Sequence, residues 1–261
     1  MAELFFSASV DRFANSDQSL MNVAAIIQAR IGSTRLPGKV LMDLLGAPML
    51  QRVVARTLRA ETVDDVVVAT TTESRDDTLV ELCEARGWKS FRGSQDDVLD
   101  RYYRAARFFG SDVIVRITSD CPLIDAGVID QAVRGFLDGN VDYCCNFLPA
   151  HTYPRGLEVE VFSFASLARA WQEDKNPSWR EHVTEYILHN PGRFAVVGVG
   201  VGRDLSAHRW TVDTAEDFLF VTRVYDHFGH DRFTWTDVLD FVADRPDLAA
   251  INKHVKQKVV V

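Results

Sequence analysis

Apolar and polar residues follow two different periods along the first half of the chain. Short, largely apolar runs predict strands, at residues 23–27, 64–72, 90–92 and 112–117. Apolar residues at helical spacing follow each run and predict helices, at residues 41–60, 76–87, 96–109 and 126–138. This alternation predicts an α/β fold with a doubly wound, mostly parallel sheet. Ligands of such sheets bind at the carboxyl ends of the strands.

The pattern changes at residue 141 and becomes irregular, aromatic and rich in turns as far as residue 180. Within it, apolar and acidic residues alternate over residues 157–162, which predicts a half-exposed antiparallel strand. Glu158 and Glu160 are then expected on one face of that strand. Two further strands are expected at residues 193–201 and 210–212, and helices at 163–173, 178–189, 213–228 and 234–242.

A length of 261 residues suits one large domain, with or without an insertion. We expect a domain over residues 22–245, in which 141–180 forms an irregular α+β insertion. An N-terminal extension, 1–21, precedes the domain, and a C-terminal tail, 246–261, follows it.

Composition narrows the class of protein and its partners. The chain is 47% hydrophobic and 25% charged, and its apolar runs are only strand-sized, so no membrane partner is expected. A net charge of −8 argues against non-specific binding of nucleic acid. The four cysteines form no CxxC pair, which favours reduced thiols in a cytoplasmic protein over a zinc site.

The loop that follows the first strand carries candidate chemistry. Arg30, Arg35 and Lys39 place three cations within ten residues, and Gly32 allows close approach of the backbone. Free N–H groups and nearby cations at a strand end favour a phosphate or another anion. The alternative is a basic loop on the surface.

The run Gln28-Ala29-Arg30-Ile31-Gly32-Ser33-Thr34-Arg35-Leu36-Pro37-Gly38-Lys39 resembles the signature loop of the sugar cytidylyltransferases. That family includes CMP-Kdo synthetases, acylneuraminate cytidylyltransferases and the spore coat polysaccharide biosynthesis branch. The resemblance implies a nucleotide-diphospho-sugar transferase fold, similar to GT-A, in which this loop wraps the triphosphate of CTP. It implies catalytic roles for Arg30 and Lys39 and nucleotide contacts from a wider set, Gln28, Ala29, Arg30, Gly32, Ser33, Arg35 and Lys39.

Two aspartates are candidate ligands for Mg²⁺, and both are expected to be catalytic. Asp120 opens a run, Asp-Cys-Pro-Leu-Ile, that resembles the family's metal-binding Asp-x-Pro-Leu-Ile. Asp213 opens a run, Asp-Thr-Ala-Glu-Asp, that resembles the family's late aspartate motif. Two carboxylates at strand ends suit Mg²⁺, with phosphate oxygens and water completing its ligands. The alternative is that Asp120 caps one helix and that Asp213 or Thr214 caps the other, with Glu216 completing a capping box there.

Candidate contacts to the nucleoside and the acceptor lie elsewhere in the chain. Thr71, Arg92, Gly93 and Ser94 follow predicted strands, and the last three resemble the family segment that meets the nucleoside. Ser94 alternatively caps a helix. Acceptor contacts are expected from five residues, Arg116, Glu158, Glu160, Arg180 and His182. A lone helical histidine is more often structural.

The resemblance implies a Mg²⁺-dependent enzyme that joins CMP from CTP to a sugar acid or related acidic metabolite and releases pyrophosphate. It also implies a homodimer, with residues 141–180 at the contact. Gln28 stands where the sugar-acid enzymes usually have proline, so the acceptor need not be Kdo or neuraminate. Two alternatives remain: a nucleotide-sugar-dependent glycosyltransferase of the same fold, whose usual Asp-x-Asp motif is not matched at Asp120, and a non-catalytic nucleotide-binding scaffold.

Overall fold

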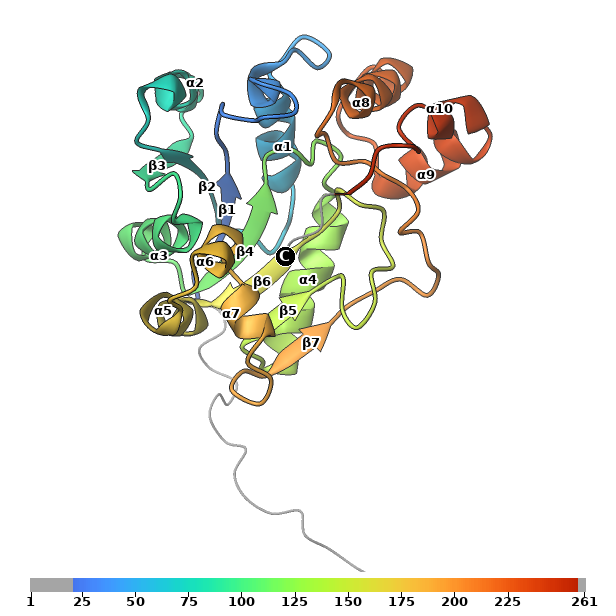
Figure 1. Cartoon of the computed structure of the whole chain (residues 1–261). Helices are drawn as coiled ribbons and strands as arrows, with labels where there is room; N and C mark the ends of the chain where they lie inside the picture. The colour runs from blue at the N-terminus through green and yellow to red at the C-terminus, as the bar shows by residue number, and fades with distance from the viewer. Residues whose placement is uncertain (1–20, 258–261) are drawn as a thin grey trace, which may run out of the picture.

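The computed structural model describes residues 21–257 (Figure 1). The predicted N-terminal extension, apart from Met21, and the last four residues of the predicted tail lie outside the described residues.

Seven strands form one sheet in the order β3-β2-β1-β4-β6-β5-β7. Their bounds are β1 Val23–Gln28, β2 Asp65–Thr71, β3 Lys89–Gly93, β4 Val113–Thr118, β5 Tyr143–Cys145, β6 Glu160–Ser163 and β7 Val196–Gly198. Strands β1 to β4 run parallel, while β6 runs antiparallel to its neighbours β4 and β5. The predicted doubly wound, mostly parallel α/β sheet is therefore confirmed.

Helices cover both faces of the sheet (Figure 1). Their bounds are α1 Met49–Thr57, α2 Asp77–Arg86, α3 Val98–Phe109, α4 Ala126–Gly139, α5 Phe164–Glu173, α6 Pro177–His182, α7 Glu185–Leu188, α8 Ala215–Phe228, α9 Trp235–Ala243 and α10 Pro246–Ala250, with 3-10 turns η2 Lys39–Leu41 and η3 Ser74–Asp76. Alternate residues of β1 point to opposite faces, so Ala25 and Ile27 join one core and Ile26 the other. Helices α3, α5 and α7 complete the second core, and α1, α4 and α8 belong to the first.

Two predicted helices differ from the structure because local backbone geometry interrupts them. The helix expected from residue 41 begins at Met49, since Leu45 and Gly46 adopt positive φ and Asp43 caps the Gly46 N–H at 3.0 Å. The helix expected over residues 178–189 is two short helices, α6 and α7, because Val183 between them has a φ of 68°.

Three predictions in the second half of the chain were wrong in detail. Strand β6 is buried between β4 and β5 rather than half-exposed. Residues 210–212 form no strand, because the Trp210 N–H bonds to Arg155 while the Val212 N–H bonds to Asp120, on another segment. Residues 246–250 form α10, whose Leu248 is buried, so the predicted tail begins as part of the fold.

No helix within residues 21–257 has the length and apolarity that crossing a membrane requires.

Candidate active site

The loop after β1 folds back on itself before it reaches η2. The Ile31 carbonyl accepts hydrogen bonds from Ser33 N–H at 2.8 Å and Gly38 N–H at 3.1 Å. Gly38 has a φ of 71°, which favours glycine. On the other side, the Ile31 N–H donates to the Asp76 carboxylate at 2.7 Å, which anchors the loop to the end of β2. A side chain on Gly32 would meet the Arg75 guanidinium at 3.2 Å. The loop is therefore held in one shape by its own backbone.

Lys39 joins the loop to both predicted metal aspartates. Its ammonium donates to Asp120 Oδ2 at 3.0 Å, to Asp213 Oδ1 at 3.1 Å and to the Val212 carbonyl at 2.6 Å. Burial alone would lower the pKa of Lys39, but the two carboxylates outweigh it and raise that pKa above its ordinary value. Burial would likewise raise the pKa of Asp120, and the Lys39 ammonium holds it below its usual range. Lys39 and Asp120 therefore stabilise each other's charged forms.

Neither aspartate caps a helix, so the alternative interpretation is wrong for Asp120 and Asp213, although it is right for Thr214. Asp125 is the N-cap of α4 and accepts from the N–H of Gly127 and Val128. Thr214 is the N-cap of α8, and Asp217 rather than Glu216 completes its capping box. Asp120 and Asp213 instead line both cavities of the cleft and accept from cationic side chains.

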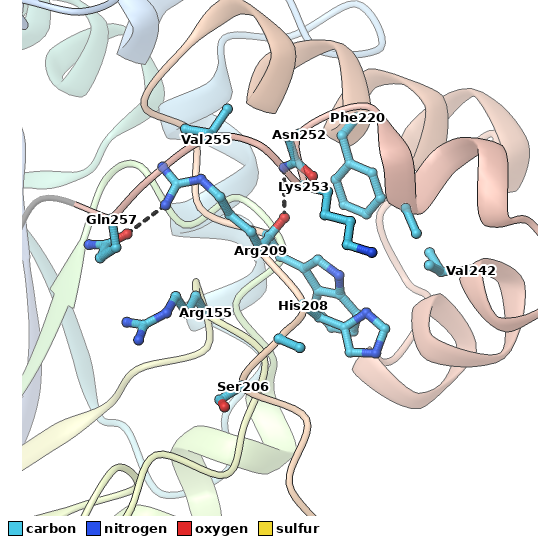
Figure 2. A pocket seen from close by; sticks show the side chains of 13 residues that line it. Arg155, Ser206, His208, Arg209, Phe220, Val242, Asn252, Lys253, Val255 and Gln257 are labelled. Atoms are coloured by element: carbon cyan, nitrogen blue, oxygen red, sulfur yellow. Dashed lines mark hydrogen bonds between the residues drawn. The ribbon is translucent and has the colours of Figure 1, made fainter.

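Arg209 binds Asp213, and the C-terminal segment in turn holds Arg209 through Asn252 and Gln257 (Figure 2). Its guanidinium donates to Asp213 Oδ2 at 2.8 Å and to Asp217 Oδ1 at 2.8 Å. Asn252 donates to the Arg209 carbonyl at 2.9 Å, and the Gln257 side chain accepts from the Arg209 guanidinium at 2.5 Å. These residues line a cavity of about 290 Å³, with Arg155 on its wall. The predicted tail thus supports the candidate metal site.

Two larger cavities meet at the aspartates. The loop cavity, of about 310 Å³, is lined by the loop after β1 and by α3. The strand cavity, of about 650 Å³, is lined by β4, β6 and the segments beside them. The residues that line both are Gln28, Arg35, Thr118, Asp120, Glu181, His182 and Asp213. A molecule in one cavity therefore reaches a molecule in the other beside Asp120 and Asp213.

A buried ion pair forms part of the wall of the strand cavity. Arg116 on β4 and Glu160 on β6 are directly opposite in the sheet and form a salt bridge. Tyr143 and Thr184 donate their hydroxyls to the same Glu160 oxygen, at 2.7 and 2.6 Å. Glu158 lines the same cavity, as the predicted shared face requires, and lies 2.9 Å from the His151 ring. Glu160 is therefore occupied by protein groups, whereas Glu158 remains closer to the open cavity.

All seven residues predicted in the loop line a cavity, and their contacts to a nucleotide stay predictions. Ala29, Arg30, Gly32, Ser33 and Lys39 line the loop cavity, and Gln28 and Arg35 line both cavities. The Arg35 guanidinium contacts Asp213 at 2.9 Å.

Five predicted contact residues line neither of these two cavities. The buried Thr71 hydroxyl donates to Asp76, and the Arg92 guanidinium binds the Thr71 and Glu73 carbonyls. The Ser94 hydroxyl accepts from the Asp97 N–H at 3.0 Å, but the N-cap of α3 is Asp97, so the alternative that Ser94 caps the helix is wrong.

Gly93 and Arg180 also contact other protein groups rather than either cavity. Gly93 faces the Arg101 side chain, and the Arg180 guanidinium binds Asp97 at 2.8 Å and two carbonyls. In the structure, these residues shape the walls of the cleft, and their direct contacts to ligands remain predictions.

Several lining residues were not predicted from the sequence. Arg101, inside the helical pattern of α3, lines the loop cavity, and Arg155 and Gln257 line the strand cavity. The sequence gives only a weak signal for Arg101. It is a cation on the buried face of the helix, between Val98 and Ala105. Arg155 and Gln257 come from irregular segments, whose position depends on the whole fold.

His182 lies at the junction of the cavities because the chain turns sharply after it. The Thr184 N–H donates to the His182 carbonyl at 2.8 Å, and Val183 between them has φ 68° and ψ −52°. This is the γ-turn with positive φ, which is rare and strained, and Val183 is a buried β-branched residue. Such strain costs on the order of 1–3 kcal/mol and persists only where surrounding structure imposes it.

The strain at Val183 predicts an inverted order of stability for two variants. In the middle of a helix or strand, a protein with glycine is less stable than the same protein with alanine by about 0.5–1 kcal/mol. At Val183 we expect Val183→Gly to be more stable than Val183→Ala by about 1 kcal/mol, since alanine keeps the steric cost of positive φ. Urea unfolding of both proteins measures the difference. Greater stability of the alanine variant would show that the turn is unstrained.

The doubly wound sheet has the fold of the nucleotidyltransferases. Residues 24–239 match a family model described as Cytidylyltransferase. The chain therefore belongs to the sugar cytidylyltransferase family, and it is a CTP-dependent nucleotidyltransferase.

Similar proteins cover almost the whole chain. An uncharacterized protein of Methanocaldococcus jannaschii is 40% identical over 240 residues, which are 91% of this chain and 97% of that protein. Spore coat polysaccharide biosynthesis protein SpsF of Bacillus subtilis is 31% identical over 240 residues, 88% of this chain and 91% of that protein. The solved structure of a cytidylyltransferase from Leptospira borgpetersenii has a TM-score of 0.84 at 33% identity and covers 92% of this chain and 99% of that one.

Proposed function

We propose that this enzyme transfers CMP from CTP to a sugar acid or related acidic small molecule and releases pyrophosphate. The observation that carries the proposal is the meeting of Lys39, Asp120 and Asp213 at the junction of the two cavities. The nucleotide would occupy the loop cavity and the acceptor the strand cavity. The α-phosphate then lies at the junction, where an acceptor oxygen can reach it.

The residues of the loop cavity supply the electrostatic part of the reaction. When an acceptor oxygen attacks the α-phosphorus and the bond to pyrophosphate breaks, negative charge moves onto the departing oxygens. Arg30, Arg35 and Lys39 line the cavity that would hold those oxygens. Cations already fixed in place stabilise such charge without reorganisation, which is the main source of catalysis in phosphoryl-type transfers.

The donor set at the junction fits a divalent cation. Asp120 and Asp213 bring carboxylate oxygens to within 3.0 and 3.1 Å of one ammonium, so the two groups converge on a common point. Hard oxygen ligands suit Mg²⁺. Within residues 21–257 no third carboxylate, histidine or cysteine completes a cluster that could hold a metal. We infer that phosphate oxygens and water complete the ligands, and that bound Mg²⁺ supplies positive charge at the transferred phosphate.

Two observations support an acidic, sugar-like acceptor. Arg155 lines the strand cavity and forms no salt bridge within the described part of the chain, whereas Arg35 and Arg116 are paired with Asp213 and Glu160. A guanidinium without a carboxylate partner favours an acid in the ligand. The Bacillus subtilis relative is a spore coat polysaccharide biosynthesis protein, which favours a precursor of a polysaccharide.

Pyrophosphate release tests the proposal directly. The assay contains Mg²⁺ and one of CTP, UTP, ATP or GTP, with a panel of sugar acids, phosphorylated sugars and phosphonates. We expect release with CTP and an acidic acceptor. Absence of CTP binding by calorimetry would contradict the assignment of the loop cavity, and release with a neutral acceptor alone would contradict the acidic class.

We also propose a homodimer. The exposed large apolar residues within residues 21–257 are Leu58, Phe108, Val196 and Leu219. None belongs to the predicted contact, 141–180. Phe108 is 72% exposed and packs against Phe91 and Phe109. We expect light scattering to give twice the mass of the chain, and Phe108→Ser to shift the mass toward one chain. A wild-type monomer at micromolar concentration would contradict the dimer.

A further inference from the structure

Arg101 is a buried cation on the wall of the loop cavity. Its side chain extends from α3, and the residue is only 2% exposed. One guanidinium nitrogen donates to the Ser94 carbonyl at 3.0 Å, but the buried Nε–H has no partner among residues 21–257. Arg101 also forms no salt bridge with a described residue. Burying a charge without a counter-charge is costly, so its position needs a reason.

The surroundings of Arg101 do not supply that counter-charge. Burial lowers the pKa of Arg101, and the nearby Arg30 lowers it further. Asp76 is the acidic residue that acts on it, but the Asp76 oxygens already accept from the Ile31 N–H and the Thr71 hydroxyl. The guanidinium therefore keeps donor capacity that no neighbouring protein group uses.

The structure holds Arg101 in place with some precision. A methyl group on Gly93 would lie 2.9 Å from Arg101 Cγ and 3.0 Å from its Cβ, so a glycine is needed beside it. The Ser94 carbonyl then fixes the guanidinium plane. Gly93 and Ser94 thus act through Arg101. A donor that is fixed before binding loses little freedom when a ligand arrives, which increases affinity.

Arg101 lines the loop cavity but not the strand cavity. The α-phosphate must lie at the junction of the cavities, where Asp120 and Asp213 stand, and the cations of the loop, Arg35 and Lys39, surround that point. Arg101 and Val98, both on α3, line the loop cavity alone. Apolar Ala29 and Val40 line it as well. Most residues that line the loop cavity are polar or charged, and Val98 beside Arg101 adds an apolar surface on which a flat, uncharged base can lie.

We propose that Arg101 reads the base of the nucleotide and selects cytosine over uracil. This inference rests on the proposed binding of CTP in the loop cavity. Cytosine presents two adjacent acceptors, N3 and O2, whereas uracil presents an N3–H donor beside its O2. A guanidinium only donates, in a fork that matches two adjacent acceptors. Arg101 would therefore bind cytosine through two hydrogen bonds and meet a donor in uracil.

Calorimetry with CTP and UTP tests the inference in four proteins: wild type, Arg101→Met, Arg101→Lys and the control Arg104→Met. Arg104 lies on the same helix with a largely exposed side chain and lines neither cavity. We expect wild type and the control to prefer CTP. Arg101→Met should lose roughly 10-fold or more in CTP affinity, the usual discrimination of a two-bond contact to a base, with little change for UTP. Arg101→Lys should fall between them.

The pattern of loss separates the inference from its alternatives. An equal loss for CTP, UTP and inorganic triphosphate would make Arg101 a phosphate contact and overturn the proposal. An unchanged ratio of CTP to UTP affinity would overturn it as well. Wild-type protein that binds no nucleotide would instead overturn the proposed function.

A second variant guards against loss of fold. Gly93→Ala keeps the charge of Arg101 and displaces its side chain. It should lower the preference for CTP while circular dichroism shows an intact fold; an unchanged preference would count against the proposal.

Discussion

Asp120→Asn will lose most turnover, by roughly 10²–10³-fold or more, while the protein stays folded and binds CTP. The substitution removes one of the two carboxylates that converge on the junction of the cavities. It removes no helix cap, since Asp125 caps α4. Pyrophosphate release measures turnover, and calorimetry measures CTP affinity. Without Mg²⁺ that affinity should be unchanged or higher, because a carboxylate that repels the phosphates is gone.

Asp213→Asn should reduce turnover similarly, because Asp213 provides the second carboxylate and also anchors Arg35, Lys39 and Arg209. The matched control is Asp138→Asn, an exposed residue of α4 outside both cavities. Wild-type turnover in either active-site variant would remove that aspartate from the mechanism. Loss of CTP binding together with turnover would indicate a role in building the loop cavity instead.

Among the variants proposed, Arg116→Met will cause the largest loss of stability, about 3–5 kcal/mol. It leaves the buried Glu160 without its cation. Urea unfolding measures the change in the free energy of unfolding. The double variant Arg116→Met with Glu160→Gln should recover at least half of the loss. Glutamine carries no charge, and its oxygen still accepts from Tyr143 and Thr184. A single variant that costs less than about 1 kcal/mol would show that water or local rearrangement compensates the Glu160 charge.

The parallel half of the sheet could be predicted because its signals are local. Each of β1, β2 and β4 is an apolar run followed by a helical pattern, and the signature loop follows directly after β1. The start of α1 was less predictable. Leucines at residues 41, 44 and 45 mimic helical spacing, but the positive φ of Leu45 and Gly46 makes a turn there. Hydrophobic period alone does not show which side chains reach the core from a loop.

The residues of the candidate site likewise divide into those that the sequence predicts and those that it does not. Lys39, Asp120 and Asp213 stand in motifs that can be read directly from the chain, and the structure brings them together. Arg101 could not be singled out, because it lies in a helix and packs against Gly93 of a separate element, β3. The pairing of Arg116 with Glu160 requires knowing that β6 lies beside β4 and runs antiparallel to it. Such contacts between distant segments follow from topology, which spacing along one segment does not reveal.

The reversed direction of β6 divides the two specificities between separate parts of the chain. Because β6 is antiparallel, its beginning lies at the edge of the sheet where β4 ends, so the preceding segment, 146–159, lines the strand cavity. The loop cavity, which we propose for the nucleotide, is lined by the ends of parallel strands, the loop after β1 and α3. Changes in length or sequence within 146–159 would therefore alter acceptor choice while nucleotide use is preserved. With such a modular arrangement, a common ancestral fold can acquire new acceptors while the residues that bind the activated donor stay the same.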